Sequence, residues 1–152
     1  MTVRVLKSVR ELRVVNERGE TVFCAPIALG ADPVGPKKRE GDGKTPEGRY
    51  GICVIKEAGR HGQSLGLSYP GERDAEDALR EGRIDGAAHA AISRAHRQGL
   101  RPPWGTPLGG EIYIHAGGTG GDWTQGCIAL EAEDMAKLFA LRHQVESVEI
   151  LP

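Results

Sequence analysis

The sequence predicts a mainly β domain, either a sandwich or a small barrel, with a helical insertion and one late helix. Short apolar segments with strand-like alternation occupy the first third of the chain and its end. Apolar residues at helical spacing are confined to the middle of the chain and one late segment. Glycine occurs 22 times in 152 residues, about twice its ~7% average usage, which favours turns over long helices. Because the strands come from separated segments, a sandwich or barrel is favoured over a doubly wound sheet.

Length and charge narrow the class of protein. A chain of 152 residues can bury a substantial core and shows no linker, so we expect a single domain over residues 1–152. The 20 basic and 21 acidic residues give a net charge of −1, which excludes a global attraction to nucleic acid or anionic lipid. No run approaches the ~20 apolar residues of a membrane span. Residues 1–7 lack the apolar region and cleavage site of a secretory signal.

The first third of the chain predicts a β-hairpin. Its strands are Glu11–Asn16, with Leu12 and Val14 on one face, and Thr21–Leu29. Pro26 lies within the second strand and cannot donate a ladder hydrogen bond, so that strand is expected at a sheet edge or at a bulge.

The centre of the chain predicts a long loop, then two strands, then two helices. Gly30–Gly48 is rich in glycine and proline and is expected to be a long loop, which in a compact domain is often functional. Arg49–Lys56 and Ser64–Ser68 are predicted strands. Apolar spacing then predicts two helices, Glu72–Glu81 and Asp85–Gln98.

The last third predicts strands on both sides of a helix. Glu111–His115 alternates as a strand, and Cys127–Leu130 follows a glycine-rich stretch. Glu131–His143 is the late helix, and Val145–Leu151 is the closing strand. The core face of the helix is expected to consist of Ala132, Met135, Leu138 and Phe139.

A reactive site is expected in the segment where the glycines are densest. His115 ends a strand, a flexible glycine-rich loop follows, and Cys127 comes directly after Gly126. Folding the loop back would place the imidazole beside the thiol, and a thiol of pKa near ~8.5 needs such a base to act as a nucleophile. The N–H groups of Gly126 and Cys127 could then face a developing oxyanion. Gly117 and Gly118 would let an extended peptide approach the backbone.

Other interpretations of these residues stay open from the residues alone. Cys127 could be a small core residue, His115 a strand-end histidine with a satisfied hydrogen bond, and the loop a phosphate cradle, although it lacks the G-x-x-x-x-G-K-[ST] pattern. Cys24 and Cys53 are expected in the core, and the three cysteines are too widely spaced for a disulfide framework or a zinc ribbon. The remaining histidines are expected in solvent: His61, His89, His96 and His143.

Three ordered motifs resemble one enzyme family. Residues 114–130, IHAGGTGGDWTQGCIAL, are similar to the active-site motif of the L,D-transpeptidase catalytic domain of YkuD type. Residues 40–50, EGDGKTPEGRY, and 107–112, PLGGEI, are similar to two upstream segments of the same family. The resemblance covers essentially the whole chain, from Val3 to Leu151. It implies the L,D-transpeptidase-like β-sandwich or barrel.

The resemblance implies a role for each matching residue. Cys127 matches the nucleophile and His115 the general base, and the carbonyl of Ala116 would orient the imidazole. Gly126 and Cys127 would form the oxyanion hole. Apart from the matched motifs, Lys44 and Arg49 could pair with substrate carboxylates or be surface charges on a polar loop. The residues expected to bind substrate are Tyr69, Arg73, Gly117, Gly118, Trp123, Thr124 and Gln125.

The resemblance also implies the substrate and the reaction. Cys127 would attack the L-centre of a diamino acid such as meso-diaminopimelate in a peptidoglycan stem peptide, with release of a D-amino acid and formation of a thioester. Carbapenem β-lactams would be covalent inhibitors, and neither cofactor nor metal is implied. The family works in the periplasm or cell wall, whereas this sequence shows no export signal, so its location stays open.

Two departures from the family leave the acyl acceptor open. Ala129 stands where many members have Arg or Asn, and the loop between His115 and Thr124 is short. With GLSYP at residues 66–70 and GCIAL after the loop, these traits resemble the branch with murein endopeptidase-like and lipoprotein-releasing proteins. A transpeptidase, a carboxypeptidase or endopeptidase-type hydrolase, and a non-catalytic cell-wall binding module are therefore the three hypotheses.

Overall fold

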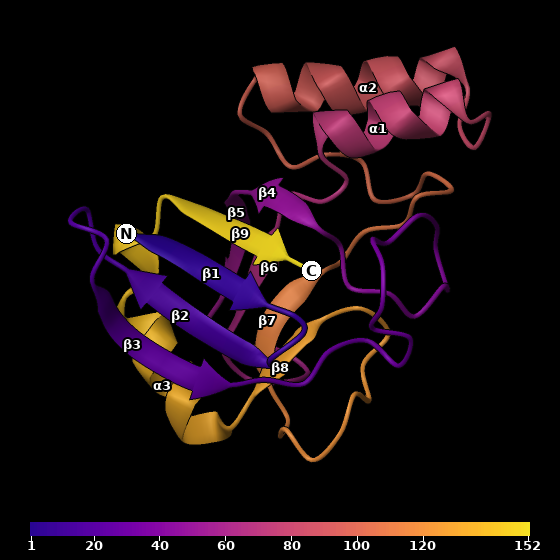
Figure 1. Ribbon diagram of the computed structural model, residues 1–152. Coiled ribbons are helices and arrows are strands. Elements are labelled where there is room, and N and C mark those ends of the chain that lie inside the picture. The colour runs from indigo at the N-terminus through magenta and orange to yellow at the C-terminus, as the bar shows by residue number, and fades with distance from the viewer.

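The computed structural model describes residues 1–152 and arranges the strands in two mixed sheets (Figure 1). The first sheet has the order β3-β2-β1-β9-β4. In it β1 and β9 pair in parallel, which joins the two ends of the chain, and the other pairs are antiparallel. Its strands are β1 (Thr2–Leu6), β2 (Glu11–Val15), β3 (Thr21–Pro26), β4 (Gly48–Tyr50) and β9 (Ser147–Leu151).

The second sheet has the order β5-β6-β7-β8. The strands β5 (Ile52–Lys56) and β6 (Ser64–Leu67) form a hairpin, and β6 pairs antiparallel with β7 (Tyr113–Ala116). The last strand, β8 (Ile128–Leu130), pairs in parallel with β7. That parallel pair determines where the chemistry-bearing residues meet.

Apolar side chains of both sheets meet in one buried core. Alternation along β1 buries Val3 and Val5 and leaves Arg4 exposed, as expected of a strand with one face in the core. Leu65 of β6 and Ile114 of β7 belong to the same cluster. A fully buried side chain of this size contributes roughly 1.5–3 kcal/mol to folding.

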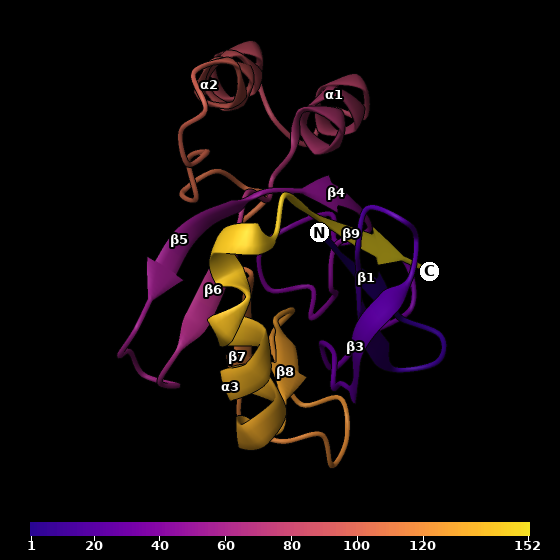
Figure 2. The ribbon, with the colours of Figure 1, turned by 90° about the vertical axis from the view of Figure 1, so that its left-hand side faces the viewer.

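Three helices complete the fold. The helices α1 (Glu72–Arg80) and α2 (Gly86–Arg97) pack on each other and project beyond the sandwich (Figure 1). The helix α3 (Ala132–Ala140) covers β6 and β7 (Figure 2) and leads through a short 3-10 turn, η1 (Arg142–Gln144), into β9. Asp85 caps α2, since its carboxylate accepts the N–H of Ala88 at 2.8 Å.

The predicted fold class is confirmed, as is the edge position of β3, which contains Pro26. The sequence does not predict the strand β1, and the predicted strand Thr21–Leu29 ends at Pro26. The expected strand 49–56 is divided at Gly51 between β4 and β5, in different sheets. The late helix ends at Ala140, and Ala132 is exposed because it lies in the first turn, away from the core.

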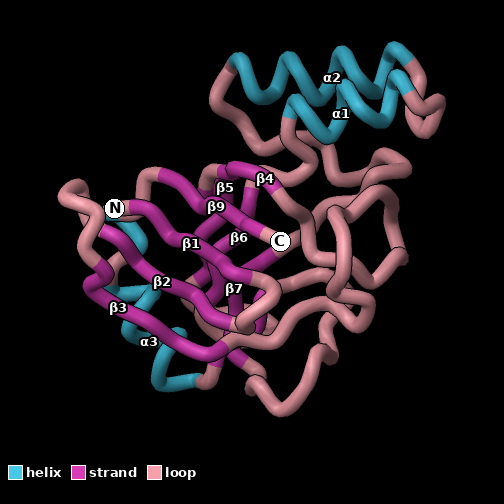
Figure 3. The backbone as a smooth tube through the Cα atoms, viewed as in Figure 1, coloured by secondary structure: helices cyan, strands magenta, loops and turns pink.

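The long loops gather on one side of the sandwich (Figure 3). The N–H of Glu40 donates to the carbonyl of Pro107, and the N–H of Ala31 donates to the carbonyl of Thr124, each at 2.9 Å. These bonds join the loops that follow β3, α2 and β7. The loops therefore support one another instead of moving independently.

Candidate active site

The parallel pairing of β7 and β8 brings His115 and Cys127 to the same hollow. The register sets Ile114 opposite Ile128, so Cys127, directly before β8, lies beside Tyr113. Alternate residues of a strand share a face, and His115 is two residues beyond Tyr113. The hollow has a volume of about 250 Å³, and its lining also includes Lys56, Arg60, His61, Ser64 and Glu111.

The imidazole of His115 is oriented by the backbone. Its Nδ1 is hydrogen-bonded to the carbonyl of Ala116 at 2.5 Å. A carbonyl only accepts hydrogen bonds, so Nδ1 carries the proton and Nε2 is the basic nitrogen. Burial lowers the pKa of His115, the Ala116 carbonyl opposes this, and the neighbouring His61 lowers it further. The net shift is downward, so His115 is neutral at pH 7.

The thiol of Cys127 is also held by backbone groups. Its Sγ accepts the N–H of Tyr113 at 3.4 Å and donates to the carbonyl of Glu111 at 3.5 Å. Burial raises the pKa of the Cys127 thiol. The resting pair is therefore a neutral thiol and a neutral imidazole, and a thiolate could form only if a base took the proton of the thiol.

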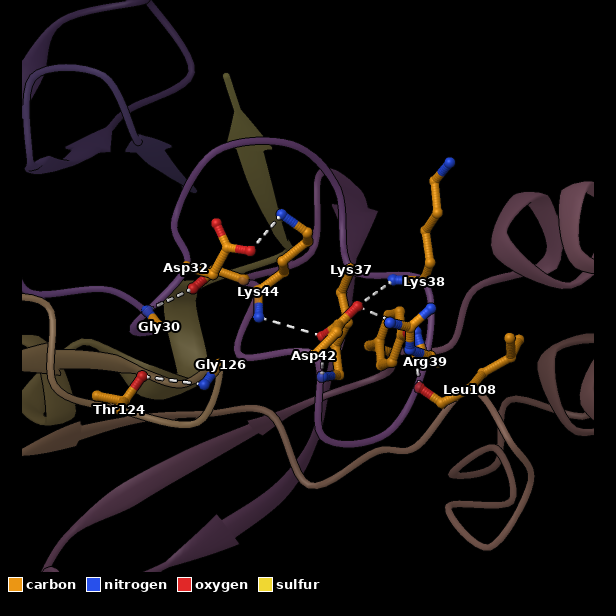
Figure 4. Close-up of polar contacts among 12 residues, drawn as sticks. Gly30, Asp32, Lys37, Lys38, Arg39, Asp42, Lys44, Leu108, Thr124 and Gly126 are labelled. Carbon is orange, nitrogen blue, oxygen red and sulfur yellow. Dashed lines mark hydrogen bonds and ion pairs between the residues drawn. The ribbon is translucent and has the colours of Figure 1, made fainter. Parts of the chain in front are cut away.

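The loop before Cys127 is fixed by a threonine. The hydroxyl of Thr124 donates to the carbonyl of Cys127 at 2.7 Å. It also accepts the N–H of Gly126 at 3.0 Å (Figure 4). Gly126 has a φ of 138°, and a Cβ there would lie 2.7 Å from the carbonyl oxygen of Lys44. Glycine is required here because the backbones of two loops touch.

The opposing loop is organised around one carboxylate. Asp42 accepts the ammonium group of Lys37 at 2.9 Å and the backbone N–H groups of Lys38, Arg39 and Lys44 at 2.8, 3.1 and 3.1 Å (Figure 4). The side chains of Lys37 and Asp42 are almost fully buried. Burial alone would raise the pKa of Asp42, but these hydrogen bonds outweigh it and hold the pKa below its ordinary value. The segment is therefore a fixed wall beside Gly126 and Cys127.

Two histidines expected in solvent make contacts that the sequence did not indicate. His61, in the β5–β6 turn, stacks on the ring of His115 with centroids 4.3 Å apart and planes 14° apart. The Nε2 of His96 lies 2.7 Å from the carbonyl of Pro70. No spacing or motif around His61 carries a signal for this contact, because it depends on how the hairpin folds over β7.

The other two cysteines differ from expectation. Cys24 is exposed, because it lies on the outward face of the edge strand β3. Cys53 of β5 is half-buried. The prediction of a core position is therefore wrong for Cys24.

The side chains expected to bind substrate lie in different parts of the fold. Tyr69 is fully buried and donates its hydroxyl to the carbonyl of Leu108 at 2.9 Å, so it belongs to the core and no peptide can reach it. Arg73 lies on α1 and lines a different hollow, together with Arg49. Trp123 is 45% exposed, with its ring centroid 5.8 Å from that of His115, and is positioned to meet a ligand.

Most of the loop residues expected to contact substrate through their backbone make contacts within the protein instead. A Cβ at Gly117 would lie 2.6 Å from the ring of Trp123, and the carbonyl of Gly118 accepts the indole N–H at 2.9 Å, so both glycines position Trp123. Thr124 is buried. Gln125 is exposed. The N–H of Gly126 is already bound, which leaves the N–H of Cys127 as the unbonded donor beside the thiol.

The cations near the thiol are not those expected. Lys44 is paired with Asp32 at 2.9 Å, and Arg49 with Glu149 at 3.6 Å. Instead, the hollow is lined by two other cations, Lys56 and Arg60, and by Glu111. The sequence does not predict the position of Lys56 and Arg60, because their closeness to Cys127 depends on the β5–β6 hairpin.

The structure was also searched for metal sites and for membrane-spanning helices. No group of three or more His, Cys, Asp or Glu side chains gathers as a metal site. None of the helices is both long enough and apolar enough to span a bilayer.

Comparisons with known proteins identify the family and the fold. Residues 2–150 match the YkuD family model, described as the L,D-transpeptidase catalytic domain. The fold is similar to that of the L,D-transpeptidase from Xylanimonas cellulosilytica, with 12% identity, a TM-score of 0.59 and coverage of 99% of this chain and 59% of that chain. It is also similar to Bd1075 from Bdellovibrio bacteriovorus, with 18% identity, a TM-score of 0.59 and coverage of 99% and 47%.

A third similar structure contains an inhibitor. The LD transpeptidase LdtMt1 in complex with imipenem has 17% identity and a TM-score of 0.50, with coverage of 99% of this chain and 58% of that chain. At such identities the likeness concerns the fold. The chain spans between 47% and 59% of the length of these three. No curated protein matches the sequence.

Proposed function

The chain belongs to the L,D-transpeptidase catalytic domain family, and from this premise we propose that it transfers the acyl group of a peptidoglycan stem peptide through a thioester on Cys127. The observation that carries the proposal is the backbone-oriented imidazole of His115 in the same hollow as the Cys127 thiol. A tethered base next to a thiol is the arrangement that nucleophilic catalysis requires.

The acylation step follows from the protonation states. The Nε2 of His115 takes the proton of the Cys127 thiol as Sγ attacks the carbonyl carbon at the L-centre of a diamino acid. The N–H of Cys127 stabilises the oxyanion of the tetrahedral intermediate. The imidazolium then donates its proton to the leaving amine, and the D-amino acid departs and leaves a thioester.

The second step returns the enzyme to its starting state. Nε2 of His115 accepts a proton from the amine of a second stem peptide as that amine attacks the thioester. The new amide is the cross-link, and the thiol of Cys127 regains its proton from the imidazolium. The carbonyl of Ala116 holds the ring in one tautomer through both steps, and this is the role of the carboxylate in a Ser-His-Asp triad.

The first experiment tests the nucleophile. Intact protein is exposed to imipenem, the ligand of a structurally similar L,D-transpeptidase, and weighed. We expect one covalent adduct on the natural chain and on the control Cys24→Ala, whose cysteine is exposed, and none on Cys127→Ala. Equal adducts on Cys127→Ala would overturn the assignment. His115→Gln is expected to slow acylation by about 10²–10⁴-fold.

The second experiment identifies the acceptor. The enzyme is incubated with stem tetrapeptides, and the products are separated by mass. Cross-linked dimers are expected for the transpeptidase. Trimmed monomers alone would identify a hydrolase, and peptide binding without any product would identify a binding module.

A further inference from the structure

We propose that Lys56, Arg60 and Arg101, with the rings of Tyr113 and Trp104 between them, form a carboxylate-binding strip that selects stem peptides with free side-chain carboxylates over amidated ones. The identity of the ligand rests on the proposed function. The strip itself rests on charge and geometry outside the catalytic pair.

The cations of the strip have no anionic partner within the protein. Lys56, Arg60 and Arg101 are exposed, and none of them takes part in an ion pair or a side-chain hydrogen bond. By contrast, Arg10, Lys37 and Lys44 are all paired with carboxylates. Lys56 and Arg60 line the hollow directly. Unpaired cations at the mouth of a partly enclosed hollow attract an anionic group.

The position of Lys56 follows from local packing. A Cβ at Gly66 would lie 2.9 Å from the ring of Tyr113, so glycine allows that ring to lie across β6. The ammonium of Lys56 then lies over the ring, 4.8 Å from its centroid. A Cβ at Gly59 would lie 3.4 Å from Cδ of Lys56, so the hairpin tip packs beside the Lys56 stem. The backbone N–H of Tyr113 touches the Cys127 thiol, which places the charge near the reacting atoms.

The strip continues away from the hollow. The ring of Trp104 meets that of Tyr113 edge-on at 5.8 Å, and the guanidinium of Arg101 lies over Trp104 at 4.4 Å. Trp104 is fixed, because its N–H donates to the carbonyl of Tyr69 at 3.0 Å and because a Cβ at Gly110 would lie 2.2 Å from its ring. Cations on a fixed aromatic row suit an extended peptide with more than one carboxylate.

The charged side chains of the hollow also match the side-chain centre of meso-diaminopimelate. The side-chain centre of meso-diaminopimelate carries both an ammonium and a carboxylate group. Lys56 and Arg60 can bind the carboxylate, and Glu111 in the same hollow can bind the ammonium. Amidation removes the charge that the cations recognise and leaves the ammonium unaffected.

Two synthetic stem tetrapeptides test the strip. Both end in meso-diaminopimelate and D-alanine, and one is amidated at the diaminopimelate side-chain carboxylate. Binding to the full chain with Cys127→Ala is measured by calorimetry at low and at physiological salt. We expect the free carboxylate form to bind about tenfold more tightly at low salt, and the preference to shrink as salt rises.

Matched variants locate the preference. Adding Lys56→Met and Arg60→Gln is expected to equalise the two affinities, and Arg101→Gln to weaken both peptides about threefold. The control Arg80→Gln, on the exposed side of α1, is expected to leave the preference intact. Equal affinities before these changes, or a preference that survives Lys56→Met with Arg60→Gln, would overturn the strip.

A parallel measurement separates this proposal from the proposed function. The chain with its natural Cys127 is weighed after incubation with each peptide. Acylation by both peptides at equal rates and equal affinities would overturn the strip and support the thioester. Acylation by neither peptide would overturn the proposed function, whereas a tenfold binding preference would still support the strip.

Discussion

Two segments border the nucleophile, and they are held in opposite ways. The β3–β4 loop (residues 27–47) is fixed by the buried pair of Lys37 and Asp42 and by Thr45, whose hydroxyl accepts the N–H of Gly30 at 3.0 Å. In the β5–β6 tip (residues 57–63) every residue is exposed. The contacts of the tip include a hydrogen bond from the N–H of Gly62 to the carbonyl of Gly59, the contacts of His61 with the rings of His115 and Trp123, and an ion pair between Glu57 and Arg142 at 3.8 Å.

The difference assigns the two segments different tasks. Segments with few buried contacts open at low free energy, whereas densely bonded ones open only with much of the fold. The β3–β4 loop touches the backbone at Gly126 and so fixes Cys127. The β5–β6 tip supplies Arg60 and His61 to the hollow and can adjust to a ligand. Changes in the loop should therefore affect stability, and changes in the tip should affect rates.

The largest effect is expected from Asp42→Ala. It leaves the ammonium of Lys37 buried without its partner, which costs about 3–5 kcal/mol. The control is Asp32→Ala, because Asp32 is 60% exposed and its pair with Lys44 is worth ~1 kcal/mol or less. Urea denaturation measures both. Similar losses for the two variants would contradict the fixed wall.

The same carboxylate predicts how stability depends on acid. Its pKa is lower in the folded protein than in the unfolded chain. The stabilisation is therefore complete above the unfolded pKa of ~3.9 and is lost as pH falls through the folded pKa. Asp42→Ala should flatten the decline in unfolding free energy below about pH 4. An unchanged decline would show that the fold does not lower the pKa of Asp42.

The second effect is expected from Gly126→Ala. The new Cβ would meet the Lys44 carbonyl at a φ of 138°, a strain of about 1–3 kcal/mol. Relief of the clash displaces Cys127, so acylation by imipenem should slow by at least about 10²-fold. Gly120→Ala is the control, because nothing lies within 4 Å of its Cβ. Normal acylation of Gly126→Ala would contradict the contact between the loops.

A smaller effect is expected from Thr124→Val. It removes the hydroxyl that bonds the carbonyl of Cys127 and the N–H of Gly126, and leaves both buried groups unsatisfied at a cost of about 1–3 kcal/mol. Thr124→Ser keeps the hydroxyl and should restore most of the stability and rate. Equal defects in the two variants would show that the methyl group, and not the hydroxyl, matters.

The same contrast explains what could be predicted from the sequence. His115 and Cys127 are brought together by strands close in sequence, so their position in one hollow could be predicted. The contacts of Lys56, Arg60 and His61 depend on where a distant hairpin folds, and no periodicity encodes that. The prediction that Tyr69 lines the groove is wrong for a related reason. An aromatic residue with a hydroxyl group can lie in a binding groove, or it can be buried in a core where one carbonyl accepts its hydroxyl, as that of Leu108 does here.

The smallest effect on stability, and the most direct test of the tip, is expected from His61→Ala. The tip is exposed, so the unfolding free energy should change by less than about 0.5 kcal/mol. Removing the ring uncovers His115 and removes the coulombic contribution of His61, so the lowered pKa of His115 should rise toward its ordinary value of ~6.5. Acylation needs neutral His115, so the rate falls as pH falls through this pKa, and the fall should begin at higher pH in the variant. His61→Phe keeps a stacked ring without the imidazole and should show an intermediate shift, whereas His143→Ala, on the far turn η1, should show none. Superimposable pH profiles for the natural chain and His61→Ala would mean that the tip does not influence the base.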